Sequence, residues 1–234
     1  MIDPGSRVEA YKRAAAERAL QLVRPGMVVG LGTGSTARYF IEGLGRMVQE
    51  GFAVQAVVTS SDSRRRAIEC GLALRDHLER PVDLTVDGAD EIDGSLNCIK
   101  GRGGALLREK IVAHASLRFV LIADESKLVD QLGRGPVPVE VLPFLWERTS
   151  EGIAGLGGRP VLRVDGEGPS VTDNGNLILD LSFAEGIANA LELGAAIKGT
   201  IGVVEHGLFV GITDTCIVAG PDGPRVMGGA IQTS

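Results

Sequence analysis

The stretch DLTVDGADEIDGSLNCIKGRGGALLREK, from Asp83 to Lys110, groups acids, a lysine and glycines between apolar residues in a chain of 234 residues. Its first four residues alternate between polar and apolar and predict a short strand. Gly88, directly after Asp87, permits a sharp turn there. Asp87 and Asp90 are therefore expected at the carboxyl end of a strand, which is the edge of an α/β sheet where ligands bind.

Glu109 lies in a helix that is expected to begin at about Ala105. A projection at 100° per residue places it among four apolar positions, which are Ala105, Leu106, Val112 and Ala113. Burial there would raise the pKa of the Glu109 carboxyl, which is the usual way in which such a group becomes a general base near neutral pH. The alternative is a surface glutamate stabilised by the helix dipole, and periodicity alone favours that alternative slightly.

A second glycine-rich segment joins a predicted strand at Met27–Leu31 to a predicted helix at Ala37–Glu50. It reads GLGTGST from Gly30 to Thr36, so backbone N–H groups, hydroxyls and a helix N-terminus would face a bound anion. Ser35 stands where the dinucleotide fingerprint has its last glycine, and no lysine follows as in a Walker A loop. The segment fits a phosphate cradle, and it fits equally well a plain turn with a capped helix.

Polar residues also follow two further predicted strands. The strand at Ala53–Val58 ends in the hydroxyl run TSSD, and the strand at Phe119–Ala123 ends in DESK. Strands that alternate with helices predict a parallel sheet, in which all these ends share one edge. Lys127 would then add a cation to a site at this edge. A lysine at such a position is more often simply exposed in a loop.

Two basic features are expected at the surface. The triplet Arg64–Arg66 opens a helix that runs through Cys70, and such triplets usually form a solvated face. Lys12 lies on a helix predicted over Val8–Val23, where it is either a surface residue or a phosphate ligand.

From Gly135 the predicted order of elements changes to βαββαβ, which is the ferredoxin-like signature. The three short strands that come last are expected to rejoin the first sheet, so the smaller unit would be an insertion. The expected domains are residues 1–134 with 207–234, and an inserted 135–206. The elements predicted from Gly135 onward are strands at Val137–Val141, Arg159–Val164, Leu177–Leu181, Thr200–Val204, Leu208–Ile212, Cys216–Ala219 and Arg225–Met227, and helices at Phe144–Leu156 and Ala184–Leu193.

Composition excludes several classes of protein. The net charge of −6 and an aromatic content of 4% disfavour a nucleic-acid binder, which needs a basic face or stacking platforms. Neither an apolar run long enough for a membrane span nor a secretion signal is found. The three cysteines share no short spacing, so we expect no metal site of the CxxC type and a reducing cytoplasm.

Taken together, seven motifs resemble ribose-5-phosphate isomerase of type A. Each is weak alone, but the acidic segment followed by the lysine, the glycines and REK is specific, and the motifs cover nearly the whole chain in order. They are VGLGTGST (29–36), TSSDS (59–63), DLTVDGADEID (83–93), KGRGGALLREK (100–110), IADESK (122–127), PVPVEV (136–141) and TDNGN (172–176).

This resemblance implies an aldose–ketose isomerase of the pentose phosphate pathway that interconverts ribose 5-phosphate and ribulose 5-phosphate without metal or organic cofactor. It implies a Rossmann-like α/β domain with a mostly parallel sheet, a small ferredoxin-like α+β lid, and a homodimer or homotetramer. By resemblance Glu109 is the proton acceptor. The substrate-binding positions are Thr33, Gly34, Ser35, Thr36, Asp87, Gly88, Ala89, Asp90, Lys100, Gly101, Arg102, Gly103 and Lys127.

The chemistry suits these residues. A proton shift between adjacent carbons needs a carboxylate base and a cation beside the developing oxyanion, which Glu109 and Lys100 would supply. Asp87 would handle the hydroxyl proton during ring opening, with Asp90 as its neighbour. Arg102 stands where the family usually has glycine, and we expect its side chain to turn outward.

Two other classes of function remain open from the sequence. One is a non-catalytic sugar-phosphate sensor on the same fold, although no output module is visible. The other is acyl or CoA transfer through a carboxylate nucleophile.

Overall fold

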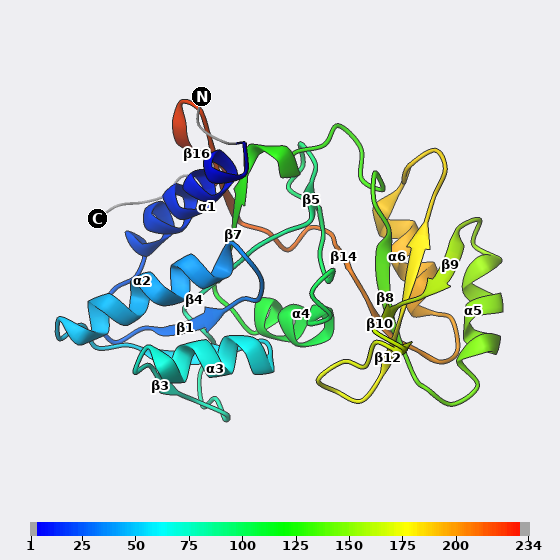
Figure 1. The fold of residues 1–234 in the computed structure, drawn as a ribbon, viewed down its shortest axis with the longest axis horizontal. Coiled ribbons are helices and arrows are strands. Elements are labelled where there is room, and N and C mark those ends of the chain that lie inside the picture. Colours follow the sequence, from blue (N-terminus) through cyan, green and yellow to red (C-terminus); the bar gives the residue numbers. More distant parts are fainter. Residues whose placement is uncertain (1–3, 230–234) are drawn as a thin grey trace. The chain divides into compact units, whose positions relative to one another are not determined.

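A computed structural model describes residues 4–229, which pack into two compact units (Figure 1). Unit 1 consists of Met1–Ala89, Arg108–Lys127 and Ile212–Ser234, and unit 2 consists of Asp90–Leu107 and Leu128–Gly211. Residues 1–3 and 230–234 of the expected large domain lie outside the described part. The packing units differ from the expected domains, because residues 90–107, 128–134 and 207–211 pack with unit 2. The functional division at 135–206 stays a prediction.

Seven strands form the sheet of unit 1 in the order β16-β15-β7-β4-β1-β2-β3. Every neighbouring pair is parallel except β15 with β16, so the predicted mostly parallel sheet is confirmed. The strands are β1 (Val28–Leu31), β2 (Gln55–Val58), β3 (Ala73–Leu74), β4 (Leu84–Asp87), β7 (Phe119–Asp124), β15 (Thr215–Gly220) and β16 (Gly223–Gly228).

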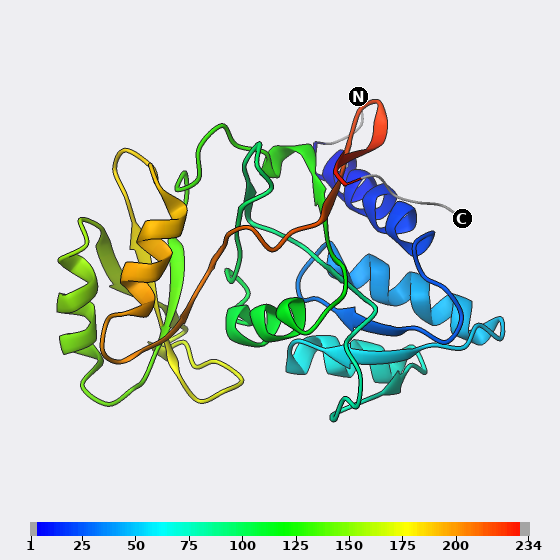
Figure 2. The ribbon, with the colours of Figure 1, turned by 180° about the vertical axis from the view of Figure 1, so that it is seen from behind.

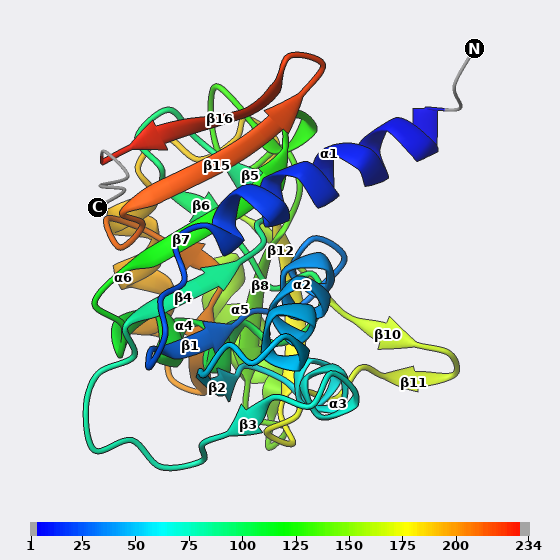
Figure 3. The same ribbon diagram turned by 90° about the vertical axis from the view of Figure 1, so that its left-hand side faces the viewer.

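Helices cover both faces of this sheet. Along β1 the side chains alternate, so Val29 and Leu31 join the core formed with the first two helices, whereas Val28 packs with Val112 of the fourth. Figure 3 shows the first three helices on one side of the strands. The helices are α1 (Pro4–Leu20), α2 (Ala37–Gln49), α3 (Ser61–Glu69) and α4 (Leu106–His114).

A polar cluster joins α1 to α2. Glu9 accepts hydrogen bonds from Lys12 at 2.8 Å, from the hydroxyl of Tyr39 at 2.5 Å and from Arg38 at 2.5 Å. The bonds from Lys12 and Tyr39 lower the pKa of Glu9 from 4.5 to about 2. A depressed pKa means that the folded state prefers the ionised carboxylate, so this contribution to stability is present above pH 4.5.

Glu9→Gln is therefore expected to be less stable than the parent protein at neutral pH, and the difference should shrink as the pH falls from 4.5 towards 2. Thermal unfolding midpoints measured across that range check this. Glu151→Gln, which removes an acid from an exposed pair with Arg148, is the matched control. A difference that does not change with pH would show that Glu9 does not act through its charge.

Unit 2 contains a four-stranded antiparallel sheet in the order β13-β8-β12-β9. In chain order its elements run βαββαβ, so the predicted ferredoxin-like arrangement is confirmed. The two helices contribute Ile153 and Ile197 to the same core as Val139 and Leu179, which places them on one face (Figure 2). The elements are β8 (Val137–Val141), α5 (Trp146–Ala154), β9 (Arg159–Leu162), β12 (Leu177–Ser182), α6 (Ala190–Lys198) and β13 (Val203–His206).

The last helix and strand of this sheet lie further along the chain than predicted. Asn189 caps α6 by accepting a hydrogen bond from the N–H of Glu192, so the helix begins at Ala190 rather than near Ala184. The following strand begins at Val203, because Gly202 has φ +90° and turns the chain first.

One predicted pairing was wrong. The strand at Leu208–Phe209, β14, does not rejoin the first sheet but pairs with β6 (Cys98–Ile99), which pairs in turn with β5 (Glu91–Ile92). Only β15 and β16 rejoin the sheet of unit 1. A short hairpin, β10 (Val164–Asp165) with β11 (Gly168–Pro169), was not predicted.

Candidate active site

The sheet of unit 1 reverses its strand order between β1 and β4. From β1 the chain continues outward to β2 and β3, and then returns to β4 on the other side of β1. In open parallel sheets, ligands bind at the carboxyl ends of the strands at such a point. The segments that begin at Gly32 and at Gly88 follow these two strands, so both predicted loops lie at the switch point.

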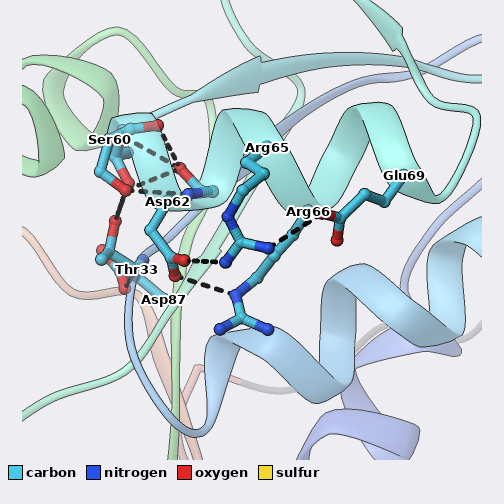
Figure 4. Close-up of polar contacts among 9 residues, drawn as sticks. Thr33, Ser60, Asp62, Arg65, Arg66, Glu69 and Asp87 are labelled. Atoms are coloured by element: carbon cyan, nitrogen blue, oxygen red, sulfur yellow. Dashed lines mark hydrogen bonds and ion pairs between the residues drawn. The ribbon is translucent and has the colours of Figure 1, made fainter.

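The loop after β1 is held by hydroxyl groups at the end of β2. The hydroxyl of Thr33 lies 2.8 Å from that of Thr59 and donates to that of Ser60 at 2.7 Å (Figure 4). Gly34, with φ +104°, and Ser35 are exposed, and α2 begins just beyond them. The side chain of Thr33 therefore fixes the loop, while Gly34 and Ser35 are accessible to an anion at the helix N-terminus.

Asp87 is fully buried at the end of β4. Its Oδ1 accepts hydrogen bonds from the backbone N–H of Thr33 at 3.1 Å and of Gly88 at 2.7 Å. A side chain at Gly32 would bring its Cβ within 2.0 Å of the same oxygen. Glycine is therefore required at position 32 for the carboxylate to approach the loop.

Glu109 is only 4% exposed on α4. The four apolar residues predicted around it are all buried as well, so the predicted helix face is confirmed and the surface alternative is excluded. These residues are Ala105, Leu106, Val112 and Ala113. A carboxyl group removed from water at a helix N-terminal turn is suited to exchange a proton with a carbon acid.

Lys127 and the arginine triplet are two further predicted features of unit 1. Lys127 is half-buried in a short 3₁₀ helix (Glu125–Lys127) that follows β7. The triplet Arg64–Arg66 forms surface ion pairs, among them those of Arg65 and Arg66 with Asp62 (Figure 4). The predicted solvated face of α3 is thus confirmed.

Lys100 belongs to unit 2 and is 2% exposed. Its backbone N–H donates to the carbonyl of Gly207 at 2.9 Å, and its ammonium lies 5.5 Å from the ring centroid of the buried Phe209. Gly101 follows with φ +104°, and a Cβ there would lie 2.8 Å from Leu106. The chain turns tightly directly after the lysine, which only glycine permits at this position.

The side chain of Arg102 is exposed, and its guanidinium end pairs with a buried acid. Its Nη2 lies 3.4 Å from the carboxylate of the fully buried Glu91, although 42% of the side chain remains exposed. The Arg102 backbone N–H donates to Asp90 at 3.0 Å. The attraction between guanidinium and carboxylate explains the position of the guanidinium.

Glu91 is a structural residue that we did not identify from the sequence. Its carboxylate accepts backbone hydrogen bonds from Gly133, Arg134 and Gly135, and it thereby anchors a segment more than 40 residues away. The only local signal was its place directly after Asp90 in the acidic motif.

The predicted site residues divide between the two units. Unit 1 holds those from Thr33 to Thr36 and from Asp87 to Ala89, together with Glu109 and Lys127, whereas unit 2 holds Asp90 and Lys100 to Gly103. Within residues 4–229 there is no group of three or more His, Cys, Asp or Glu that could hold a metal ion. In the same described range, no helix is both long and apolar enough to cross a bilayer.

Known proteins resemble this chain over nearly its full length. The family model for ribose 5-phosphate isomerase A (phosphoriboisomerase A) matches residues 55–223. The ribose-5-phosphate isomerase A of Gluconobacter oxydans is 51% identical over 94% of this chain and 96% of its own, and that of Rhodopseudomonas palustris (strain TIE-1) is 50% identical over 94% and 97%.

Solved structures agree with these relatives. Ribose 5-phosphate isomerase from Plasmodium falciparum superimposes with a TM-score of 0.91 at 38% identity, covering 95% of this chain and all of that one. A D-ribose-5-phosphate isomerase in complex with phospho-erythronic acid gives 0.91 at 39% identity, covering 95% and 99%. This chain therefore belongs to the ribose 5-phosphate isomerase A family.

Proposed function

We propose that this chain interconverts D-ribose 5-phosphate and D-ribulose 5-phosphate by proton transfer through an enediolate. Relatives that carry this name are about half identical to it over more than nine-tenths of both chains. The observation that carries the proposal is the buried carboxyl of Glu109 on α4. Such a group is the base that an aldose–ketose isomerase requires.

Glu109 acts as the proton carrier. In the open-chain aldose its carboxylate removes the proton from C2, and the C2–H electron pair forms the C1–C2 double bond of the enediolate. The same proton is then returned to C1 while the O2 hydroxyl proton moves to the O1 oxyanion, so that a ketone forms at C2 and the carboxylate is regenerated. Burial protects the intermediate from exchange with bulk water.

Lys100 and the two aspartates act on the oxygen atoms. The ammonium of Lys100 stabilises the negative charge that develops on the carbonyl oxygen as the enediolate forms. Asp87, held in one orientation by Thr33 and Gly88, accepts the O1 hydroxyl proton as the C1–O4 bond of the ring breaks, and that proton passes to O4. Asp90 orients the substrate beside it.

The phosphate of the substrate is bound by the loop after β1. The exposed residues Gly34 and Ser35, together with the N-terminus of α2, suit a dianion, and Lys127 adds a cation. Binding energy from the phosphate, remote from the reacting carbons, then positions C1 and C2. A complex of a structural relative with phospho-erythronic acid supports a sugar-phosphate ligand.

The cellular setting follows from the family resemblance. We infer a cytoplasmic enzyme of the pentose phosphate pathway that assembles as a homodimer or homotetramer. It would bind neither membranes nor nucleic acid, for which the net charge of −6 is unfavourable.

A direct assay tests this function. The purified protein should convert ribose 5-phosphate into ribulose 5-phosphate in the presence of EDTA, whereas ribose without phosphate should be converted far more slowly. Binding of ribose 5-phosphate without conversion would instead indicate a sensor. A requirement for CoA would indicate acyl transfer.

A further inference from the structure

Arg163 is a largely buried arginine between β9 and β10, with 16% of its side chain exposed. It forms a bidentate pair with Asp180 of β12, in which Nε donates to Oδ2 at 2.8 Å and Nη2 donates to Oδ1 at 2.5 Å. Its backbone is fixed too, because its N–H donates to Ile178 and its carbonyl accepts from Ser170. The guanidinium is thus mounted rigidly on the four-stranded sheet.

The remaining nitrogen of this guanidinium reaches the segment that follows Lys100. Nη1 donates to the backbone carbonyl of Gly101 at 3.0 Å and to that of Arg102 at 2.9 Å. Four of the five N–H groups of Arg163 are therefore in use. All of these contacts lie within unit 2. Arg163 is a rigid link between the sheet and the two peptide groups that follow Gly101 and Arg102.

This link adds two hydrogen bonds to the carbonyl groups of the segment. N–H groups of the segment form three further hydrogen bonds: Lys100 donates to Gly207, Arg102 to Asp90, and Gly104 to the carbonyl of Gly101. Without Arg163, the carbonyls of Gly101 and Arg102 would lose their bonds to the sheet. The tight turn at Gly101 would then be held only by the hydrogen bonds of the N–H groups named above. The turn that directly follows Lys100 would then gain freedom.

Asp180 neutralises the positive charge of Arg163. Because a carboxylate neutralises the guanidinium, the pair adds no net charge next to Lys100, and the desolvation cost of the arginine is partly offset. Arg163 is therefore suited to holding backbone and not to binding a substrate anion. A lysine in its place could not span the carboxylate and both carbonyls at once.

We propose that Arg163, locked by Asp180, is a positioning residue that holds the backbone of Gly101 and Arg102 so that Lys100 is aligned for the reaction. This rests on the proposed function, in which Lys100 stabilises the enediolate.

A double-mutant cycle tests the proposal. Arg163→Met is expected to lower kcat by about 10- to 100-fold, the scale for displacing a reacting group by about an ångström. In a Lys100→Ala background the same change should alter kcat by less than about twofold, because the residue through which Arg163 acts is gone. An equal fold loss in both backgrounds would overturn the proposal.

Further variants separate positioning from folding. Asp180→Asn, which loosens the pair without removing the arginine, should give a smaller loss of kcat and carries the test if Arg163→Met does not fold. Arg163→Lys should recover less than half of the lost activity. Arg148→Met removes an exposed arginine with a carboxylate partner and should behave as the parent protein. Asp180→Asn with full activity would contradict the proposal.

Amide hydrogen exchange gives a readout that does not need turnover. In Arg163→Met, residues 100–104 should exchange faster than in the parent protein, while α5 should not change. Unchanged exchange in that segment would overturn the proposal. If the parent protein does not isomerise ribose 5-phosphate, the proposed function fails, and the exchange experiment still decides whether Arg163 holds the segment.

Discussion

Glu109→Gln is expected to lower kcat for ribose 5-phosphate by about 10²- to 10⁴-fold, the range for loss of a general base. Glutamine has nearly the same shape, so it should fit the site on α4, where the parent side chain is buried. It cannot accept the proton from C2. KM should change little, because the proton is transferred only in the transition state.

The isotope effect sharpens this prediction. Deuterium at C2 of the substrate should lower the kcat of Glu109→Gln by at least the factor by which it lowers the kcat of the parent protein. The reason is that proton abstraction is the slow step in the variant. Glu69→Gln, on the exposed face of α3, is the matched control and should retain activity. Near-parental turnover by Glu109→Gln would remove this carboxyl from the mechanism.

Local patterns in the sequence predicted much of unit 1. Helical periodicity placed Glu109 among apolar residues, and the order of strands and helices placed Asp87 at a strand end. Both inferences depend on neighbours within a few positions, which is the range over which side-chain direction follows from secondary structure. The positions of these residues in their strand and helix could therefore be predicted, whereas their chemical roles are proposed from the family resemblance.

Features that depend on distant partners were not predicted. Arg102 turns towards Glu91, whose carboxylate in turn binds Gly135, 44 residues further along. Arg163 reaches Gly101 across 62 residues. Such contacts are set by tertiary packing, and no period or motif within one segment encodes them.

The packing units differ from the predicted domains for a similar reason. Two-residue strands such as β6 and β14 are too short to show a period-2 pattern, so their pairing could not be inferred. Their pairing brings Cys98 and Phe209 into unit 2. The part of the acidic motif from Asp90 onward consequently packs in unit 2, and Lys100 belongs to the same unit.

Lys100→Met is expected to lower kcat by about 10²- to 10³-fold, the usual result of removing one group that stabilises a developing oxyanion. Methionine keeps the unbranched apolar stem, which can remain against the ring of Phe209, but it lacks the charge. Because the oxyanion develops only as the enediolate forms, the loss should fall on kcat, and KM should remain within about threefold.

The split between the two constants identifies the role of Lys100. A rise in KM with unchanged kcat would mean that the lysine binds the substrate in its ground state, for example through the phosphate. Lys198→Met, which removes an exposed lysine paired with Glu205 in the same unit, should leave both constants unchanged. Since Lys100 is 2% exposed, thermal unfolding should be measured beside the kinetics: removing a buried charge can shift stability in either direction, whereas only the proposed role predicts a loss confined to kcat.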